Sequence, residues 1–253
     1  MRLKERVAII TGAGDIEGIG AAIAIGYAKE GADILIADIV NGEQVVKAVE
    51  KAGGKVIFTK TDVTKQDECN AMAKAAIDGF GTIDILVNNA AIYRNLIPKP
   101  FTEVTTEEWN RVMEVNTTGP FHCTKSVLPY MKKKGGKIIN ISSDVVIAGV
   151  TGLPHYVASK GAVFAFTRCM ARELGEFNIN VNSIAPGYTQ SGASKNIEKN
   201  RGENINEHLV QTRCLKRSQL PEDLVGTAIF LASRDSDFMT GQFLTVNGGM
   251  NFH

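Results

Sequence analysis

The sequence predicts an α/β fold: a single doubly wound domain, residues 1–253, with a seven-stranded parallel sheet and helices on both faces. Short runs rich in Val and Ile alternate with longer stretches of helical periodicity along most of the chain, which is typical of repeated βα units. The length of 253 residues suits one large domain, and no linker rich in proline or serine divides it.

Seven apolar runs are the expected strands, at residues 7–11, 34–38, 56–59, 83–87, 137–142, 180–184 and 243–246. Six stretches with helical periodicity separate them, at residues 18–30, 42–52, 66–80, 106–132, 155–176 and 221–233. The spacing leaves room for the long crossover that each pair of parallel strands requires. Segment 188–220 breaks the alternation because it is polar with few apolar anchors, and we expect it to be a lid over the substrate.

Charge and composition exclude several classes of partner. The 28 Lys and Arg residues nearly cancel the 27 Asp and Glu residues, which argues against a nucleic-acid partner. The sequence shows neither a membrane-spanning apolar run nor the apolar core of a signal peptide, so we expect a cytoplasmic protein. The spacing of the four cysteines predicts neither a metal site nor a disulfide framework; they are Cys69, Cys123, Cys169 and Cys214.

A glycine-rich turn follows the first expected strand, where residues 11–20 read TGAGDIEGIG. Glycines let the backbone turn sharply and approach a pyrophosphate, and the helix that follows offers unpaired N–H groups at its N-terminus. An ordinary strand-to-helix turn is the alternative interpretation. The position at the first βα junction favours a dinucleotide site that includes Gly12, Gly18 and Gly20.

The second expected strand ends at Asp38, 18 residues beyond Gly20, where a carboxylate would meet the adenosine ribose of a dinucleotide. A ribose 2′-hydroxyl can donate a hydrogen bond to this carboxylate, whereas a 2′-phosphate would be repelled by its charge. The sequence therefore predicts NAD rather than NADP as the cofactor. A solvated aspartate at the end of a strand is the alternative.

Tyr156 and Lys160 are four residues apart in an expected helix, so their Cβ atoms would lie about 5–6 Å apart on one face. A neighbouring ammonium favours the phenolate form of a tyrosine and moves its pKa toward the working range. Ser143, at the end of a strand, can hydrogen-bond the same substrate oxygen. Tyr130 and Lys134 have the same spacing, but they lie in a basic helix end that we interpret as solvated.

Together these residues resemble the short-chain dehydrogenase/reductase family, whose fold is a Rossmann domain. The resemblance covers essentially the whole chain and includes the glycine turn, the Ser143, Tyr156 and Lys160 set, and further motifs at Asp62-Val63, Asn88-Asn89-Ala90, Asn116, Pro186-Gly187 and Thr240-Gly241-Gln242. Some phrases are also similar to 1-phenylethanol dehydrogenase-like members.

The resemblance implies a role for each candidate catalytic residue. Tyr156 would be the acid/base, and Ser143 would orient and polarise the substrate oxygen. Lys160 would bind the nicotinamide ribose and lower the pKa of Tyr156, while Asn116 would hold a water that links Lys160 to solvent. Cofactor contacts are further implied for Ile19, Asp62, Val63, Asn89, Ala90, Pro186, Gly187 and Thr189.

Three positions depart from the family pattern. Five residues separate Gly12 from Gly18, two more than is usual, so the turn must bulge. Ala91 adds a methyl group where the family usually has glycine, and Ser191 stands where it often has threonine. These departures leave the contacts of residues 13–17 open.

The residues expected to face substrate are mostly apolar or aromatic, which favours a hydrophobic or aromatic secondary alcohol or ketone; they are Ser143, Val145, Tyr93, Leu153 and Tyr188, with Ile92, Val150 and His155 beside them. A 3-oxoacyl thioester reductase and a sugar or polyol dehydrogenase are alternatives within the family. A non-catalytic NAD-binding regulator is the alternative of another class. Because the family commonly forms tetramers, we also expect a homotetramer.

Overall fold

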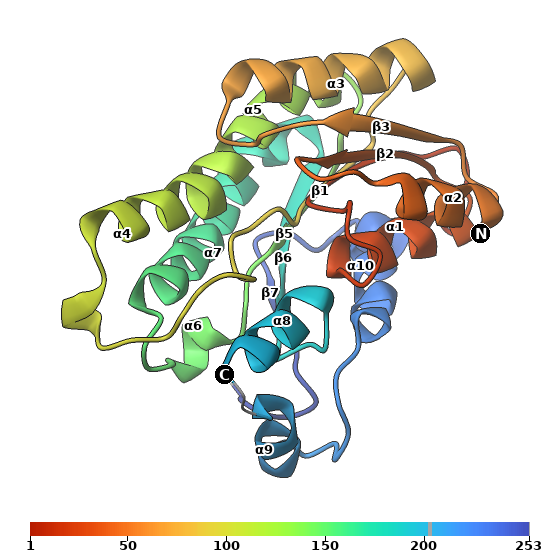
Figure 1. Cartoon of the computed structure of the whole chain (residues 1–253). Helices are drawn as coiled ribbons and strands as arrows, with labels where there is room; N and C mark the ends of the chain where they lie inside the picture. The colour runs from red at the N-terminus through yellow and green to blue at the C-terminus, as the bar shows by residue number, and fades with distance from the viewer. Residues whose placement is uncertain (202–203, 253) are drawn as a thin grey trace.

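The computed structural model describes residues 1–201 and 204–252 and has the predicted architecture, a seven-stranded parallel sheet with helices on both faces (Figure 1). The strand order is β3-β2-β1-β4-β5-β6-β7. Because this order changes direction between β1 and β4, the loops that leave these strands diverge and open a crevice at the carboxyl edge. The strands are β1 Val7–Thr11, β2 Asp33–Asp38, β3 Val56–Lys60, β4 Ile85–Asn88, β5 Gly136–Ile141, β6 Ile179–Pro186 and β7 Phe243–Val246.

Two helical layers cover the sheet. One face carries α1 Ile19–Lys29, α2 Glu43–Lys51 and α10 Val225–Ala232, and the other carries α3 Gln66–Phe80, α4 Thr106–Met113, α5 Gly119–Met131 and α7 Pro154–Leu174. Alternate residues of β2 enter opposite cores: Ile34 and Ile36 pack in one, and Leu35 and Ala37 in the other. Burial on both faces explains why the strands are continuous apolar runs.

Two expected helices have different boundaries in the structure. The stretch 106–132 is divided between α4 and α5 by a π-helical turn, Glu114–Thr118. Pro120 has no N–H to donate to the carbonyl of Asn116, so ordinary α-helical bonding is interrupted there. The stretch 221–233 begins as a 3₁₀ turn, Pro221–Leu224, before α10.

Segment 188–220 contains two helices, α8 Gly192–Arg201 and α9 Ile205–Thr212, that hydrophobic periodicity did not predict. A third unpredicted helix, the short α6 Val145–Ala148, follows β5. In Figure 1, α8 and α9 lie below the sheet and near the C-terminus. Segment 188–220 is therefore a helical structure beside the carboxyl edge of the sheet.

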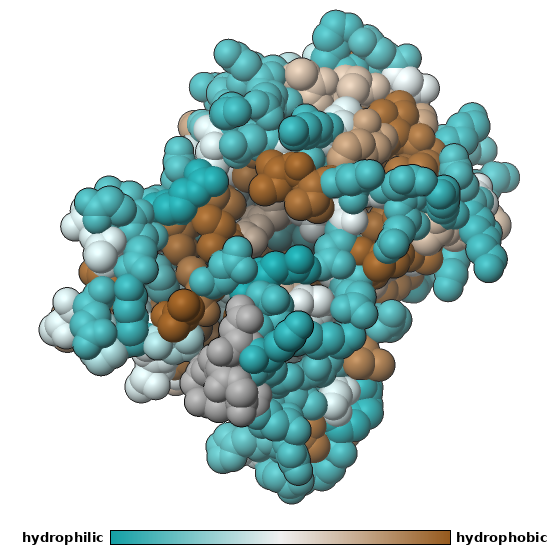
Figure 2. All heavy atoms as spheres, viewed as in Figure 1, coloured by the Kyte–Doolittle hydropathy of each residue, from teal (hydrophilic) through white to brown (hydrophobic). Residues whose placement is uncertain are grey.

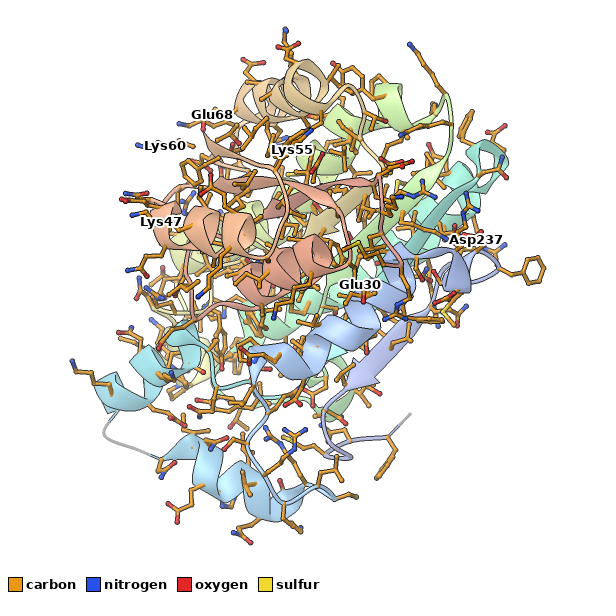
Figure 3. The ribbon with its side chains drawn as sticks, turned by 90° about the vertical axis from the view of Figure 1, so that its right-hand side faces the viewer. Glu30, Lys47, Lys55, Lys60, Glu68 and Asp237 are labelled. Carbon is orange, nitrogen blue, oxygen red and sulfur yellow. The ribbon has the colours of Figure 1, made fainter. Side chains whose placement is uncertain are left out.

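Charged side chains cover the outer surface. Figure 3 shows Lys47 on α2, Lys60 on β3 and Glu68 on α3 directed away from the sheet. In the described part of the chain, no helix combines the length and the apolar character needed to cross a membrane.

Candidate active site

A cavity of about 680 Å³ opens at the carboxyl edge of the sheet. Its walls come from the glycine turn, from the loops after β2, β3, β4, β5 and β6, and from α7. Figure 2 shows this face hollowed near its middle, with hydrophobic residues along part of the rim. The fold therefore brings the carboxyl ends of six strands, β1 to β6, around one cavity, as expected for a ligand site in a doubly wound sheet.

The glycine turn provides a cradle for an anion. Gly12 has φ +65°, and a Cβ at this position would lie 2.5 Å from the Cα of Ala90, so the turn requires glycine. Helix α1 begins after Gly18, and among the described residues no side chain caps it or places an acidic group in its first turn. Its first N–H groups are therefore available to a phosphate. These features fit a pyrophosphate-containing dinucleotide.

Asn89 holds the turn against the sheet. Its Nδ2 donates to the carbonyls of Thr11 and Gly12, at 2.9 and 2.7 Å. The Oγ1 of Thr11 accepts hydrogen bonds from the backbone N–H groups of Asn89 and Ala90. Gly20 does not line the cavity: a Cβ there would lie 2.6 Å from Asn89 Nδ2, so a glycine at this position permits the close packing of the turn against Asn89.

Asp38 lines the cavity at the end of β2, where the sequence places it. One carboxylate oxygen accepts from the N–H of Gly14 at 2.7 Å, and the other accepts from the N–H of Val40 at 3.1 Å. A carboxylate has about four lone-pair sites, so capacity remains for a hydroxyl group. Asp38 thus both fixes the glycine turn and offers an acceptor to a bound ribose.

The remaining predicted cofactor residues occupy two further walls. Asp62 and Val63 follow β3, and the Val63 carbonyl contacts His122 Nδ1 at 3.1 Å, which fixes this wall to α5. Pro186, Gly187 and Thr189 follow β6 on the other wall. All five line the same cavity as Gly12, Gly18, Ile19, Asp38, Asn89 and Ala90.

Ser143, Tyr156 and Lys160 converge on this cavity. Lys160 Nζ lies 5.7 Å from the centroid of the Tyr156 ring and donates to the carbonyl of Ile141 at 2.8 Å. The ring of Tyr93 packs against Tyr156, with centroids 5.0 Å apart. Tyr156 and Lys160 therefore share one face of α7, directed at the carboxyl edge of the sheet.

Burial controls the protonation of both groups. It raises the pKa of Tyr156 above its ordinary value, and nearby Tyr93 and Asp144 add to the rise while a hydrogen bond with Ser143 opposes it. Burial lowers the pKa of Lys160 to about 8. The predicted lowering of the Tyr156 pKa is therefore wrong, because desolvation raises it. At neutral pH the pair holds a protonated phenol beside an ammonium.

Asn116 lies in the π-helical turn and is buried without lining the cavity. Its Oδ1 accepts from the N–H of Ile92 at 2.7 Å, and its Nδ2 donates to Ser159 Oγ at 3.0 Å. Turns of this kind are frequent at functional sites because they redirect one side chain. Here the redirected side chain joins the loop after β4 to α7.

The predicted substrate residues Tyr93, Val145, Leu153 and Tyr188 all line the cavity. His155 does not: its Nδ1 accepts from the N–H of Tyr156, and its ring is buried at the start of α7. Sequence reasoning missed further lining residues, among them Arg94, Asp144, Ile197, Ile205, Leu209 and Met250. Most are isolated side chains in irregular or polar segments, so no periodic pattern marks them.

The two extra residues in the glycine turn bring it into contact with α8. Glu17 forms an ion pair with Lys195 at 3.1 Å, and its carbonyl accepts from the N–H of Gly192 at 3.2 Å. Asp15 forms an ion pair with Arg94 of the loop after β4. The turn therefore joins the side of the cavity that is predicted to bind the cofactor to segment 188–220.

Comparison with known proteins agrees with this geometry. A family model described as enoyl-(acyl carrier protein) reductase matches residues 12–251. The chain is 36% identical to the 3-oxoacyl-[acyl-carrier-protein] reductase of Thermotoga maritima, over 99% of each chain. It is 39% identical to the 5-keto-D-gluconate 5-reductase of Escherichia coli, over 94% of this chain and 92% of the relative.

Among solved structures, a 7α-hydroxysteroid dehydrogenase complexed with NADH and 7-oxo glycochenodeoxycholic acid superposes with a TM-score of 0.90 and 37% identity. The match covers 98% of this chain and 95% of that one. The matches to these relatives cover nearly the full length of the chain, and its fold and cavity agree with them. The chain therefore belongs to the short-chain dehydrogenase/reductase family of oxidoreductases.

Proposed function

We propose that this protein is an NAD-dependent oxidoreductase that interconverts a hydrophobic secondary alcohol and the corresponding ketone. The observation that carries the proposal is the convergence of Ser143, Tyr156 and Lys160 on the same cavity as the glycine turn and Asp38. A proton-transfer group and a dinucleotide cradle are the two components that such a reaction needs in one place.

Each residue of the proposed catalytic set has a distinct task. A bound nicotinamide dinucleotide would supply or accept the hydride. Tyr156, protonated at neutral pH, would donate its proton to the carbonyl oxygen during reduction, and Ser143 would hold that oxygen with a hydrogen bond. Lys160 would bind the nicotinamide ribose and support the transfer with its ammonium charge. Asn116 would keep α7 in register with the loop after β4.

Asp38 supports NAD over NADP. Its carboxylate lines the cavity with acceptor capacity remaining, and the residues that follow it, Ile39 and Val40, are apolar. A 2′-phosphate placed there would face a fixed negative charge. The solved relative is complexed with NADH, which agrees with this preference.

The apolar lining supports a hydrophobic substrate. Val145, Leu153 and Ile197 face the cavity together with the aromatic rings of Tyr93 and Tyr188. Such a surface favours an aryl, alicyclic or aliphatic carbinol over a polyol. The relative from Thermotoga maritima makes a 3-oxoacyl thioester the second candidate, because the acyl part of such a substrate is also apolar.

The proposal has two further parts, which concern segment 188–220 and the assembly of the chain. Through α8 and α9, the segment would act as a lid that excludes water during proton transfer.

The chain would assemble as a homotetramer through α4, α5 and α7, where Phe121 remains exposed. Light scattering after size-exclusion chromatography tests the assembly, and an eluting monomer would contradict it.

A substrate panel tests the proposed reaction. Absorbance of the reduced nicotinamide would be followed with NAD and with NADP, using aryl, alicyclic and aliphatic carbinols, a sugar acid and a 3-oxoacyl thioester with its reduced form. We expect turnover with NAD and an apolar carbinol. Preference for NADP, or for the sugar acid, would contradict the proposal, and binding of NADH without turnover of any substrate would indicate a regulator.

A further inference from the structure

The segment that follows β7, residues 247–252, returns to the active-site cavity. Because β7 runs parallel to β6 and ends at Val246, the chain leaves it at the same carboxyl edge where the cavity opens. Gly248 and Gly249 then turn the backbone with φ angles of +66° and +73°, which favour glycine. Met250 follows this turn, is half-buried and lines the cavity. The segment therefore places a long apolar side chain in the cavity wall.

The end of segment 188–220 supports this turn from one side. The N–H of Cys214 donates to the carbonyl of Gly249 at 3.3 Å. A Cβ at Gly249 would lie 2.8 Å from the Cβ of Cys214, so the close approach of the two segments requires glycine there. The neighbouring Arg213, 1% exposed, donates to the carbonyl of Tyr188, which also lines the cavity. Hydrogen bonds thus connect the turn before Met250 to a second part of the cavity wall.

A tether on the other side joins the segment to Asp144, which directly follows Ser143 and is 3% exposed. One carboxylate oxygen of Asp144 accepts from Asn251 Nδ2 at 3.0 Å and from Asn247 Nδ2 at 3.4 Å. Asn247 Nδ2 also donates to the carbonyl of Asn251 at 3.0 Å. Burial raises the pKa of Asp144, while the two amides and Arg213 oppose that rise. Since residue 250 lies between the two asparagines, its backbone cannot leave the cavity wall without breaking these bonds.

Asp144 is a firm anchor because its own backbone is fixed. Its N–H donates to the carbonyl of Pro186 at 3.0 Å, and its carbonyl accepts from the N–H groups of Ile147 and Ala148 at 2.9 and 3.0 Å. Its chain neighbour Ser143 is the residue proposed to hold the substrate oxygen. The tether therefore fixes the start of the Met250 side chain relative to the point where a ketone would be held.

We propose that Met250 limits the length of the larger substituent of the ketone substrate, and that Asp144 is the positioning residue that holds Met250 in place through Asn251. The proposal rests on the proposed function, in which this cavity binds an apolar ketone. A methionine side chain has three rotatable bonds and adapts to irregular space, so it defines a boundary only where its backbone is held. The substrate class is then a ketone with an apolar chain of restricted length.

Methyl ketones with straight alkyl chains of three to nine carbons measure this limit. Met250→Ala removes the side chain beyond Cβ and lengthens the space. The kcat/KM of long ketones relative to short ones should rise by about tenfold or more, since one methylene group in an apolar pocket changes kcat/KM by about 10- to 200-fold. An unchanged ratio would overturn the role of Met250. Met239→Ala is the matched control, because Met239 packs against the core and does not line the cavity; an equal rise there would also overturn it.

A double-mutant cycle tests the tether. Asn251→Ala and Asp144→Ala each remove one end, so each should raise the same ratio by about threefold to tenfold, the size expected for the loss of one hydrogen bond. The double variant should match the single ones. Asp144→Asn should retain most of the wild-type selectivity, because its amide oxygen can still accept from Asn251. Additive shifts, or an effect of Asn251→Ala that persists in the Met250→Ala protein, would overturn the positioning role.

Binding measurements separate this proposal from the proposed function. Calorimetry would give Kd for each ketone with the Tyr156→Phe protein saturated with NADH, with and without Met250→Ala. A gain in affinity confined to long ketones supports the length limit, whereas equal Kd ratios, or no binding of any ketone, overturn it. If the wild-type protein turned over none of these ketones, the proposed function would fail, and the Kd ratios would still decide the role of Met250.

Discussion

The two sides of the cavity are built in different ways. On the side predicted to bind the cofactor, called the cofactor side below, the glycine turn, Asn89 and Asp38 are joined by hydrogen bonds to backbone groups at the ends of adjacent strands. On the side predicted to bind the substrate, called the substrate side below, the wall comes from side chains of α6, α8, α9 and the loop after β4, which are distant in sequence. The hydrogen-bonded wall has a fixed shape, which suits a ligand that many proteins of this fold share. The side-chain wall can change its apolar residues without disturbing the sheet.

Tyr156 and Lys160 stand at the junction of the two sides, so their loss should have the largest effect. Lys160→Met retains the volume of the buried side chain and removes its charge. We expect kcat to fall by about 10²–10⁴, the usual contribution of a positioned proton-transfer system, because Tyr156 would lack its neighbouring cation. Steady-state kinetics check this, and a kcat within threefold of wild type would show that the charge at this junction is dispensable.

Asp38→Ala tests the cofactor side. A hydrogen bond to a charged acceptor contributes about 1.5–3 kcal/mol, so the preference for NAD over NADP should fall by about 10- to 100-fold. The ratio of kcat/KM for the two cofactors measures this, with KM for the carbinol as the internal control. An unchanged ratio would mean that the selectivity comes from another residue.

Gly12→Ala tests whether the shape of the turn is as strictly required as its backbone suggests. The φ of +65° and the 2.5 Å approach to Ala90 Cα mean that the backbone must shift. We expect a loss of about 1–3 kcal/mol in the free energy of unfolding and weaker NADH binding. Chemical denaturation and fluorescence titration measure the two effects; Ala193→Val on the substrate side is the comparison and should leave NADH binding unchanged.

Glu17→Gln tests the bridge between the two sides and should have the smallest effect. Exposed ion pairs contribute about 0–1 kcal/mol. The KM values for NAD and for the carbinol should therefore differ from those of the wild type by at most about threefold, and this difference should disappear at high salt. The double variant Glu17→Gln/Lys195→Gln should match the single variants, since either one already removes the pair. Additive losses in the double variant would contradict a direct interaction.

The same division explains which features the sequence predicted. The strands and the glycine turn follow from local patterns, and the positions of Asp38, Ser143 and Tyr156 follow from strand ends and helical spacing. Neither α8 nor α9 has a strong apolar periodicity, because their few apolar residues face a cavity and not a core. The burial of Asp144 among Asn247, Asn251 and Arg213 joins segments about 70 to 100 residues apart, and no local pattern reports such a contact. His155 is likewise buried, with its Nδ1 accepting from the N–H of Tyr156, and helical spacing alone does not predict this.

The most direct test of the account is the Tyr156→Phe protein, which lacks one phenolic oxygen. Its affinity for NADH should stay within about threefold of wild type, because the glycine turn and Asp38 remain intact. Turnover of the best carbinol with NAD should fall by about 10²–10⁴. Turnover within tenfold of wild type, with NADH still bound, would show that Tyr156 does not transfer the proton.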